Sequence, residues 1–481
     1  MAGTPLYDVI VVGAGPVGQT VATRVRAQGL SVALIERELV GGECSYWGCV
    51  PSKAMLRPVL ALSDVRRVDG ARQAVTEPVD ASGVFARRDR YTTNWDDTGQ
   101  YDALTALDVD VIRGHARLLG PRHLSVTHAG GADQILTARH AVAICTGSTA
   151  SIPDIPGVSE ANPWTNRRAT DTHAVPRRLA VVGGGGVGVE MATAWQGLGS
   201  QVTLLVRTSQ VLPRMEPFVG RHVAQGLIGA GVDVRTDTHV TALRREEATG
   251  PLEVTLGSGA TLTVDEILFA TGRTPNTTDI GLDNIGLTPG SWLEVDDGCL
   301  VQGVEGSWLY ALGDVNHRAL LTHQGKYQAR VAGNAIAARA HGRPLDTSPW
   351  GAHVATADTA AVPQAFFTDP EAGAVGLTAA ECADRGYRCK TVDVDMGARV
   401  PGANFFADGY TGQARLVIDV DRNVLLGFSF VGPGVAELLH AATVAITGQV
   451  TLERLWHAVP CFPTISEVWL KLLESARDSL G

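Results

Sequence analysis

The sequence predicts an α/β protein with two Rossmann-like dinucleotide-binding domains and a smaller α+β domain at its C-terminus. A strand, a glycine-rich turn, a helix and a second strand follow one another near the N-terminus, and the same order returns 170 positions later. The last third changes to strands followed by helices, which is typical of an α+β unit. A chain of 481 residues has room for about three domains of ordinary size.

The composition excludes several classes of protein. Apolar residues make up 45% and charged residues 19% of the chain, which is ordinary for a globular fold and excludes disorder as the main state. A net charge of −10 argues against nucleic acid as a partner. No uncharged apolar run reaches the ~18 residues of a membrane span, so we expect no membrane association. The N-terminus lacks a basic segment and a small-residue cleavage site, so we expect a cytoplasmic protein.

The first glycine motif predicts a dinucleotide site. An apolar run over 8–12 precedes the glycine loop, a helix follows, and a second apolar strand over 31–35 ends at Glu36. The glycines of the loop are Gly13, Gly15 and Gly18. They let the backbone approach a pyrophosphate at the helix N-terminus, while Glu36 can accept hydrogen bonds from a ribose. The alternative is a glycine-rich turn that only packs a helix on a sheet.

The second glycine motif differs from the first at the position of the acid. The strand 179–182 leads into a loop and a helix, and Val206 stands where the first copy has Glu36. The glycines of this loop are Gly183, Gly185 and Gly188. A missing carboxylate next to Arg207 favours a ribose that carries a 2′-phosphate, so this site is predicted to prefer NADPH, with NADH still possible. Alternatively, Arg207 is a solvated side chain that discriminates nothing.

Each motif is followed by a strand that ends in Thr-Gly, with prolines beyond it. The two dipeptides are Thr146–Gly147 and Thr271–Gly272. We expect the chain to cross between domains near these points. The predicted domains are residues 1–150 (first part of the first nucleotide-binding domain), 151–275 (second nucleotide-binding domain), 276–350 (return to the first) and 351–481 (interface domain).

Two of the seven cysteines, Cys44 and Cys49, lie close together just after the first motif. Pro51 fits the first turn of a helix, so we expect Cys49 at a helix N-terminus, where a thiol pKa is lowered. Such a pair can form a small redox-active ring. A metal site is the rival, although no nearby histidine completes a four-ligand zinc set. Two buried cysteines without a role are the third alternative.

Seven segments in a fixed order resemble the class I pyridine nucleotide-disulfide oxidoreductases, the family of dihydrolipoamide dehydrogenase, glutathione reductase and mercuric reductase. They are GAGPVG, GGEC…GCVPSK, GGGGVGVE, ATGRTPN, LGDV, FTDPEAGAVGLT and FPTISE. The resemblance covers nearly the whole chain. It implies an FAD-binding domain, an inserted NAD(P)H-binding domain and a C-terminal dimerisation domain, in a homodimer whose subunits share the active site.

The resemblance also implies roles for single residues. Electrons would pass from NADPH through FAD to a Cys44–Cys49 disulfide, with Cys49 nearer the flavin and Cys44 facing the substrate. Lys53 and Glu190 would form a pair beside the flavin, and Asp314 would bind its ribityl chain. The further expected cofactor contacts are Gly42, Lys53, Thr146, Gly147 and Gly272.

The last motif departs from the family pattern. Most relatives carry a histidine, the acid/base of the substrate-facing thiol, where this chain has Phe462, while Glu467 is kept. Phenylalanine moves no proton. His457 and Cys461 are candidate substitutes, although a surface histidine and a packing cysteine are the plainer interpretations. The change disfavours glutathione-type and dihydrolipoamide chemistry, and a C-terminus without a cysteine pair disfavours mercuric reduction. A carboxylase relative, 2-ketopropyl-coenzyme M oxidoreductase, also has the phenylalanine. It pairs this residue with a histidine, whereas the present chain keeps Glu467.

The predicted activity is reduction, or reductive cleavage, of a small sulfur-containing molecule, a disulfide or a thioether. The alternative is an NAD(P)H:quinone or diaphorase-type reductase, in which electrons leave the flavin directly. A non-catalytic flavoprotein that serves as a binding partner is a third possibility.

Overall fold

The computed structural model describes residues 5–247 and 250–480, without the side chains of 479 and 480. The chain forms two compact units. The first comprises Met1–Pro51, Asp89–Ala150 and Arg273–Asp358. The second comprises Ser52–Arg88, Ser151–Gly272 and Thr359–Gly481. Each unit therefore joins segments that are distant in the sequence.

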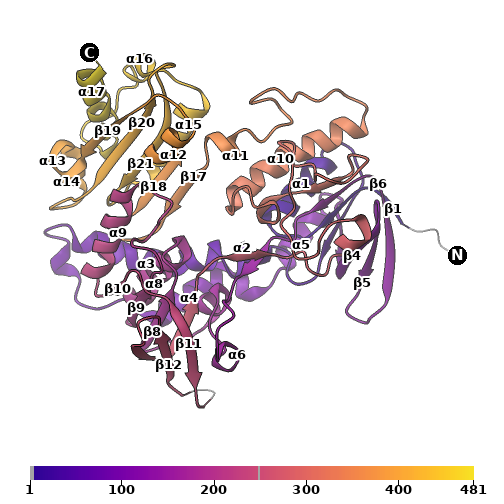
Figure 1. The fold of residues 1–481 in the computed structure, drawn as a ribbon, viewed down its shortest axis with the longest axis horizontal. Helices are drawn as coiled ribbons and strands as arrows, with labels where there is room; N and C mark the ends of the chain where they lie inside the picture. Colours follow the sequence, from indigo (N-terminus) through magenta and orange to yellow (C-terminus); the bar gives the residue numbers. More distant parts are fainter. Residues whose placement is uncertain (1–4, 248–249, 481) are drawn as a thin grey trace. The chain divides into compact units, whose positions relative to one another are not determined.

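The first unit is built on a seven-stranded sheet of order β3-β2-β1-β6-β5-β4, with β16 paired to β6 (Figure 1). The strands are β1 (Leu6–Val12), β2 (Val32–Glu36), β3 (Asp110–Arg113), β4 (His115–Gly120), β5 (His123–Thr127), β6 (Asp133–Ile144) and β16 (Leu309–Ala311). The strands β3, β2, β1, β6 and β16 run parallel. The loops after β1, β6 and β16 therefore leave from one edge of the sheet, which is where open α/β sheets bind ligands.

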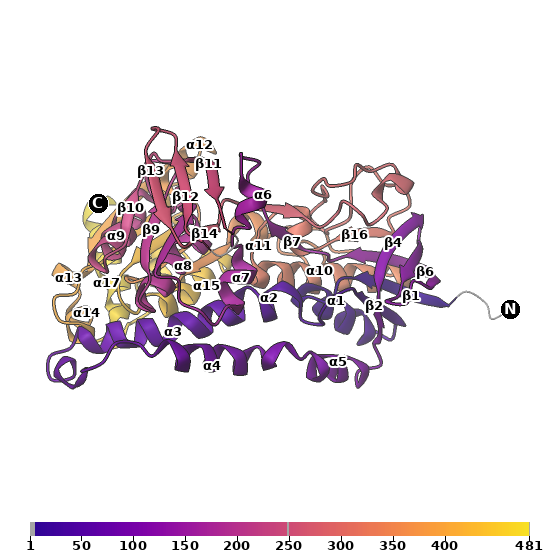
Figure 2. The same cartoon turned by 90° about the horizontal axis from the view of Figure 1, so that it is seen from below.

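Helices flank this sheet. Those in contact with it are α1 (Pro16–Arg26), α5 (Thr98–Thr105) and α10 (Thr322–Ala340). The unit also contains α2 (Gly42–Tyr46) and the start of α11 (Ala357–Ala360). Helices α1 and α10 contact each other and lie side by side in both views (Figures 1 and 2). A short pair, β7 (Ser148–Ala150) and β15 (Arg273–Pro275), joins the two places where the chain leaves and re-enters this unit.

The second glycine motif lies in a four-stranded parallel sheet of order β10-β9-β8-β14 in the second unit. The strands are β8 (Arg178–Val182), β9 (Gln201–Leu205), β10 (Asp233–Arg235) and β14 (Glu266–Phe269). A three-stranded sheet adds β11 (Val240–Arg245), β12 (Leu252–Leu256) and β13 (Thr261–Val264). The helices are α3 (Cys49–Arg66), which begins in the first unit, α4 (Ala81–Tyr91), which ends in the first unit, α6 (Val158–Ala161), α7 (Asn166–Asp171), α8 (Gly186–Gly197) and α9 (Pro217–Gly229).

The C-terminal part is an antiparallel sheet of order β17-β18-β21-β20-β19 with helices packed on it. Its strands are β17 (Pro363–Phe366), β18 (Ala372–Gly376), β19 (Cys389–Asp395), β20 (Gln413–Asp419) and β21 (Val424–Val431). Its helices are α12 (Ala379–Asp384), α13 (Met396–Arg399), α14 (Pro401–Phe406), α15 (Leu439–Thr447), α16 (Leu452–Leu455) and α17 (Val468–Leu480). The predicted fold class is confirmed: two dinucleotide-binding domains and an α+β C-terminal domain. Among the described residues, no helix is long and apolar enough to cross a membrane.

Candidate active site

The first glycine loop leaves open space where a pyrophosphate would lie. Gly13 has φ +99°, and a Cβ there would meet the Cys145 carbonyl oxygen at 2.5 Å. A Cβ on Gly18 would overlap the carbonyl oxygen of Gly13, so the helix packs tightly on the turn. By contrast, a Cβ on Gly15, the residue before α1, would meet nothing within 4 Å. The helix N-terminus is thus open to an anionic group.

Glu36 is held ready to accept hydrogen bonds at the end of β2. Its carboxylate accepts the backbone N–H of Ala14 at 2.7 Å and of Glu38 at 2.8 Å. It is 9% exposed, and burial raises its pKa above the ordinary value. The structure therefore places a desolvated carboxylate against the glycine loop, as a ribose-binding acid requires.

Around the same sheet edge, Thr146 carries a buried hydroxyl that has no hydrogen-bond partner in the described part of the chain. Its carbonyl accepts from Asn276 Nδ2 at 2.9 Å. A buried hydroxyl without a partner is costly, and a bound ligand that supplies one removes that cost. The open turn at Gly15, the Glu36 carboxylate and this hydroxyl all fit the FAD that the resemblance implies.

Asp314, in the turn after β16, lies in a polar cluster of the same unit. Its Oδ2 accepts from Ser148 Oγ at 2.5 Å, and Arg273 Nε donates to that Ser148 oxygen at 2.6 Å. Arg273 also lies 3.8 Å from Glu43 in the redox loop. Two further residues that were expected to contact the cofactor are glycines with positive φ. Gly147 has φ +69° and Gly42 has φ +56°, and a Cβ added to Gly42 would lie 3.0 Å from the Cα of Gly15.

The second glycine loop repeats the first with one change. Gly183 has φ +123°, a Cβ on Gly188 would overlap the Gly183 carbonyl oxygen, and a Cβ on Gly185 would meet nothing within 4 Å. Val206 lies against this loop, as Glu36 lies against the first loop at Ala14. A Cβ added to Gly184 would stand 2.6 Å from Val206 Cγ1. The neighbouring Arg207 is exposed. Near this loop, Gly272 has φ +149°.

Cys44 and Cys49 are two reduced thiols in contact at the start of α3, which begins at Cys49 as Pro51 predicts. The hydrogen bond between the two thiols, and then burial, hold the pKa of Cys44 well above the ordinary value. Cys49 Sγ lies 3.3 Å from the hydroxyl of Thr322, the first residue of the 19-residue helix α10. Two helix N-termini and this hydroxyl favour a thiolate on Cys49, while Cys44 keeps the proton.

Lys53 and Glu190 form an ion pair in the second unit, with Nζ and Oε2 2.6 Å apart. Glu190 is buried on α8, and its other oxygen accepts the backbone N–H of Phe367 at 3.1 Å. The Lys53 ammonium also lies 5.1 Å from the centre of the Phe367 ring. The structure thus brings together the two residues that the sequence analysis paired.

The residues of the last motif lie in the second unit, whereas both redox cysteines lie in the first. Phe462 is 72% exposed, and His457 and Cys461 are exposed as well. Glu467 is buried and accepts the backbone N–H of Gly402 at 3.3 Å. Within the described chain Glu467 is therefore part of the domain's own packing, while the Phe462 ring faces outward.

Sequence reasoning missed two features and could not show a third in full. The structure joins Cys382 on α12 to Cys389 on β19 in a disulfide, although the sequence analysis paired only Cys44 with Cys49. It also missed Thr322, whose place beside Cys49 depends on the packing of α10. The orphaned hydroxyl of Thr146 was expected at the cofactor, but its lack of a partner is visible only in three dimensions.

Comparison with known proteins finds relatives over nearly the whole chain. The model of the pyridine nucleotide-disulphide oxidoreductase family matches residues 7–342, and the model of its dimerisation domain matches 362–473. Dihydrolipoyl dehydrogenase of Haloferax volcanii is 30% identical over 98% of this chain and 96% of its own length. Mercuric reductase of Staphylococcus aureus is 28% identical over 96% of this chain and 81% of its own. The Cu(II) complex of the HOCl-induced flavoprotein disulfide reductase RclA from Escherichia coli shares the fold, with a TM-score of 0.83 and 23% identity over 98% of this chain and 99% of that one.

Proposed function

Because the chain belongs to the pyridine nucleotide-disulphide oxidoreductases, we propose that it uses NADPH, FAD and the Cys44–Cys49 pair to reduce a small sulfur-containing molecule, a disulfide or a thioether. The observation that carries this proposal is the contact between the two thiols, with Cys49 facing the N-terminus of α10. A spectator pair would need neither the contact nor the helix ends that stabilise a thiolate.

The first unit supplies the residues that would hold FAD. Gly15 leaves room for the pyrophosphate, Glu36 accepts from the ribose, and the hydroxyl of Thr146 gains a partner. Asp314 would bind the ribityl chain, and the Lys53–Glu190 pair would lie beside the reactive ring. When bound, FAD would supply the acceptor for the hydride of NADPH and the route for an electron pair to the cysteines.

The two thiols then have different tasks. With a disulfide as substrate, Cys44, once deprotonated, attacks one substrate sulfur, which forms a mixed disulfide and releases the other half of the substrate as a thiol. Cys49 attacks the Cys44 sulfur, which releases the second half and restores the Cys44–Cys49 disulfide. The raised pKa of Cys44 makes its deprotonation the difficult step, since Phe462 stands where relatives carry a base.

We attribute the preference for NADPH to Val206 and Arg207. Val206 offers no carboxylate to a ribose, and Arg207 is exposed beside it. The first motif shows what a carboxylate at this position does, because there Glu36 accepts the backbone N–H of Ala14 in the glycine loop. Val206→Glu should shift the ratio of kcat/KM for NADPH and NADH toward NADH by about ten-fold or more. An unchanged ratio would overturn this part of the proposal.

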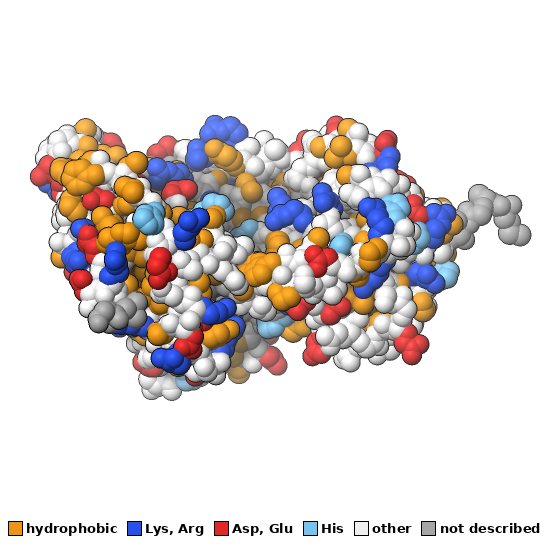
Figure 3. Space-filling view, turned by 90° about the horizontal axis from the view of Figure 1, so that it is seen from above, with side chains coloured by type: hydrophobic (Ala, Val, Ile, Leu, Met, Phe, Trp, Pro, Cys, Tyr) orange, Lys and Arg blue, Asp and Glu red, His pale blue; other side chains and the backbone are white. Residues whose placement is uncertain are grey.

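We also propose a homodimer with an active site shared between subunits. The C-terminal domain matches the dimerisation domain of the family. It exposes large apolar side chains, and Figure 3 shows hydrophobic side chains at the surface on the left, over this domain. The most exposed ones are Phe405, Val444, Val459 and Phe462. Apolar surface of this kind is covered in protein interfaces.

Replacement of Cys44 with serine tests the proposal. The variant should keep FAD and accept electrons from NADPH, yet lose at least about a hundred-fold in the rate of disulfide reduction, because serine cannot attack sulfur in this exchange. Full disulfide reductase activity would refute the proposal. The second candidate, a quinone reductase, is favoured by one observation, the absence of a base at Phe462. It predicts quinone reduction that is equal in the wild type and in Cys44→Ser.

A further inference from the structure

Asp358, the last residue of the first unit, is a buried carboxylate to which the proposed chemistry gives no task. Its side chain has no exposed surface. Its Oδ1 accepts from Gln324 Nε2 at 2.9 Å, and its Oδ2 accepts from Gln328 Nε2 at 2.8 Å. Arg318 Nε lies 3.3 Å from the same Oδ2. Asp358 therefore joins two glutamines of α10 through its two oxygens.

One oxygen of Asp358 tethers the first turn of α10. Gln324 is the third residue of this helix, and Thr322, whose hydroxyl lies 3.3 Å from Cys49 Sγ, is its first. Leu321, which precedes the helix, provides no side-chain cap. The hydrogen bond from Gln324 to Asp358 therefore helps to fix the place of this turn and of the hydroxyl at Cys49.

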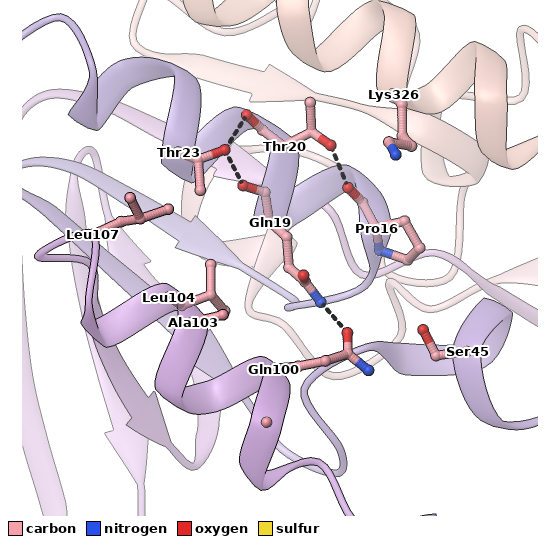
Figure 4. Close-up of a pocket in the computed structure, with 11 residues that line it drawn as sticks. Pro16, Gln19, Thr20, Thr23, Ser45, Gln100, Ala103, Leu104, Leu107 and Lys326 are labelled. Atoms are coloured by element: carbon pink, nitrogen blue, oxygen red, sulfur yellow. Dashed lines mark hydrogen bonds between the residues drawn. The ribbon is translucent and has the colours of Figure 1, made fainter. Parts of the chain in front are cut away.

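A pocket of the first unit places a second turn of α10 at the same space as the redox loop (Figure 4). Lys326 lines this pocket one helical turn after Thr322, and Ser45 lines it from the redox loop. The position of α10 therefore sets the surroundings of the redox loop at two successive turns of the helix.

The other oxygen of Asp358 orients the amide of Gln328, which has no exposed surface. Because Gln328 Nε2 donates to Asp358, its Oε1 faces away from that carboxylate. Oε1 accepts the backbone N–H of Gly313 and the Nδ2 of Asn316, each at 2.8 Å. Gly313 comes directly before Asp314 in the turn after β16. Gln328 thus links Asp358 to the turn that carries Asp314.

Ionised Asp358 lowers the stability of the fold at neutral pH. Burial outweighs the two glutamine hydrogen bonds and the charge of Arg318, and raises the pKa of Asp358 from 3.8 to about 6. The folded chain holds this proton more tightly than the unfolded chain, so the free energy of unfolding falls as the pH rises between these two values. The carboxylate instead provides two acceptors side by side, which no neutral side chain of its size offers.

We infer that Asp358 is a positioning residue of the redox centre, which holds the first turn of α10 at Cys49 and the turn of Asp314 in one fixed arrangement. It acts on the first turn through Gln324 and on the second through Gln328. The inference rests on the proposed function, because that function brings Cys49 and Asp314 to one flavin. Asp358 lies in none of the seven segments that carry the family resemblance.

Two glutamine variants separate the two links. Methionine keeps the length of glutamine but forms no strong hydrogen bond. Gln324→Met should raise the pH midpoint of Cys49 ionisation in the reduced enzyme by about half a unit, because the Thr322 hydroxyl is held less firmly. Gln328→Met should raise the Kd for FAD, read from flavin released on dilution of the holoenzyme, about ten-fold or more. Each variant should leave the other quantity unchanged.

Asp358→Leu removes both acceptors and should show both changes, with a weaker charge-transfer band between Cys49 and the flavin. Asn334→Leu is the matched control on the same helix. The amide oxygen of Asn334 accepts from Arg24 Nε at 2.7 Å, so this variant also loses a hydrogen bond of α10. It should leave the Cys49 midpoint and the Kd for FAD at their wild-type values.

A residue that only stabilised the fold would change both quantities together. The inference is overturned if Gln324→Met and Gln328→Met, both folded by circular dichroism, leave both quantities unchanged or change both alike. The proposed function then stands, since the wild type still forms the charge-transfer band. If the wild type forms no such band at two electrons, the proposed function fails, and the inference fails with it. The two glutamine variants decide the question even where Asp358→Leu does not fold.

Discussion

Three side chains decide where the redox pair keeps its proton. Cys44 hydrogen-bonds to Cys49, and the hydroxyl of Thr322 lies 3.3 Å from the Cys49 sulfur. Cys49 also lies at the N-terminus of α3 and beside that of α10. The hydrogen bond between the two thiols raises the pKa of Cys44, and a hydrogen bond between Cys44 and the Thr322 hydroxyl offsets part of that rise. We propose that the pair stores a thiolate at Cys49 and keeps a protonated nucleophile at Cys44. This division suits electron uptake at one sulfur and substrate attack at the other.

Thr322→Val removes the hydroxyl beside Cys49 and keeps the shape of the side chain. Loss of a hydrogen bond to a thiolate costs about 1.5 kcal/mol or more, so the pH midpoint of Cys49 ionisation in the reduced enzyme should rise by about one unit. The midpoint is read from the absorbance of the thiolate. Thr322→Ser retains the hydroxyl and should behave as the wild type. An unchanged midpoint in Thr322→Val would contradict the role given to this contact.

In the active site that we propose to be shared between subunits, Phe462 would leave the proton of Cys44 without an acceptor. Because the pKa of Cys44 is raised, the reactive thiolate is scarce at neutral pH and increases with pH. The rate of disulfide reduction should therefore climb with pH above neutrality. Phe462→His, with Glu467 retained, should raise the rate at neutral pH about ten-fold or more and flatten the pH profile. Phe462→Leu serves as the control, and equal profiles for the two variants would contradict a proton-transfer role at this position.

At the scale of elements, the two glycine loops share one geometry. Both place an extended glycine, Gly15 or Gly185, before a helix, with φ of −65° and −78°. Any residue adopts such angles, and neither Cβ position meets an atom within 4 Å. An alanine therefore fits the protein at both positions. Its methyl group enters only the space that a pyrophosphate would take.

Gly15→Ala and Gly185→Ala form a matched pair. Gly15→Ala should fold but lose most of its FAD, which is measured as flavin absorbance per protein. Gly185→Ala should keep FAD and require about ten-fold more NADPH for half-maximal flavin reduction. Circular dichroism checks that both variants are folded. If Gly185→Ala instead lost its flavin while Gly15→Ala kept it, the assignment of the two loops would be reversed.

At the scale of the whole molecule, the sequence predicts what local patterns determine. The two strand–turn–helix motifs lie where the glycines and the acid at Glu36 indicate, because the spacing of a Rossmann unit is local. The Cys382–Cys389 disulfide was not predicted, since it depends on how α12 packs beside β19. The same holds for Lys326, whose place in a pocket with Ser45 results from the packing of α10. Single residues from distant segments meet only in the folded chain.

The central claim is that the cysteine pair takes up electrons from NADPH through the flavin. Anaerobic titration of the holoenzyme with NADPH, followed by absorbance, tests it most directly. The account predicts that two electrons produce a long-wavelength charge-transfer band between the Cys49 thiolate and the flavin, and that Cys49→Ser lacks this band. Direct bleaching of the flavin in the wild type, without such a band, would contradict the dithiol mechanism and favour direct reduction of quinones.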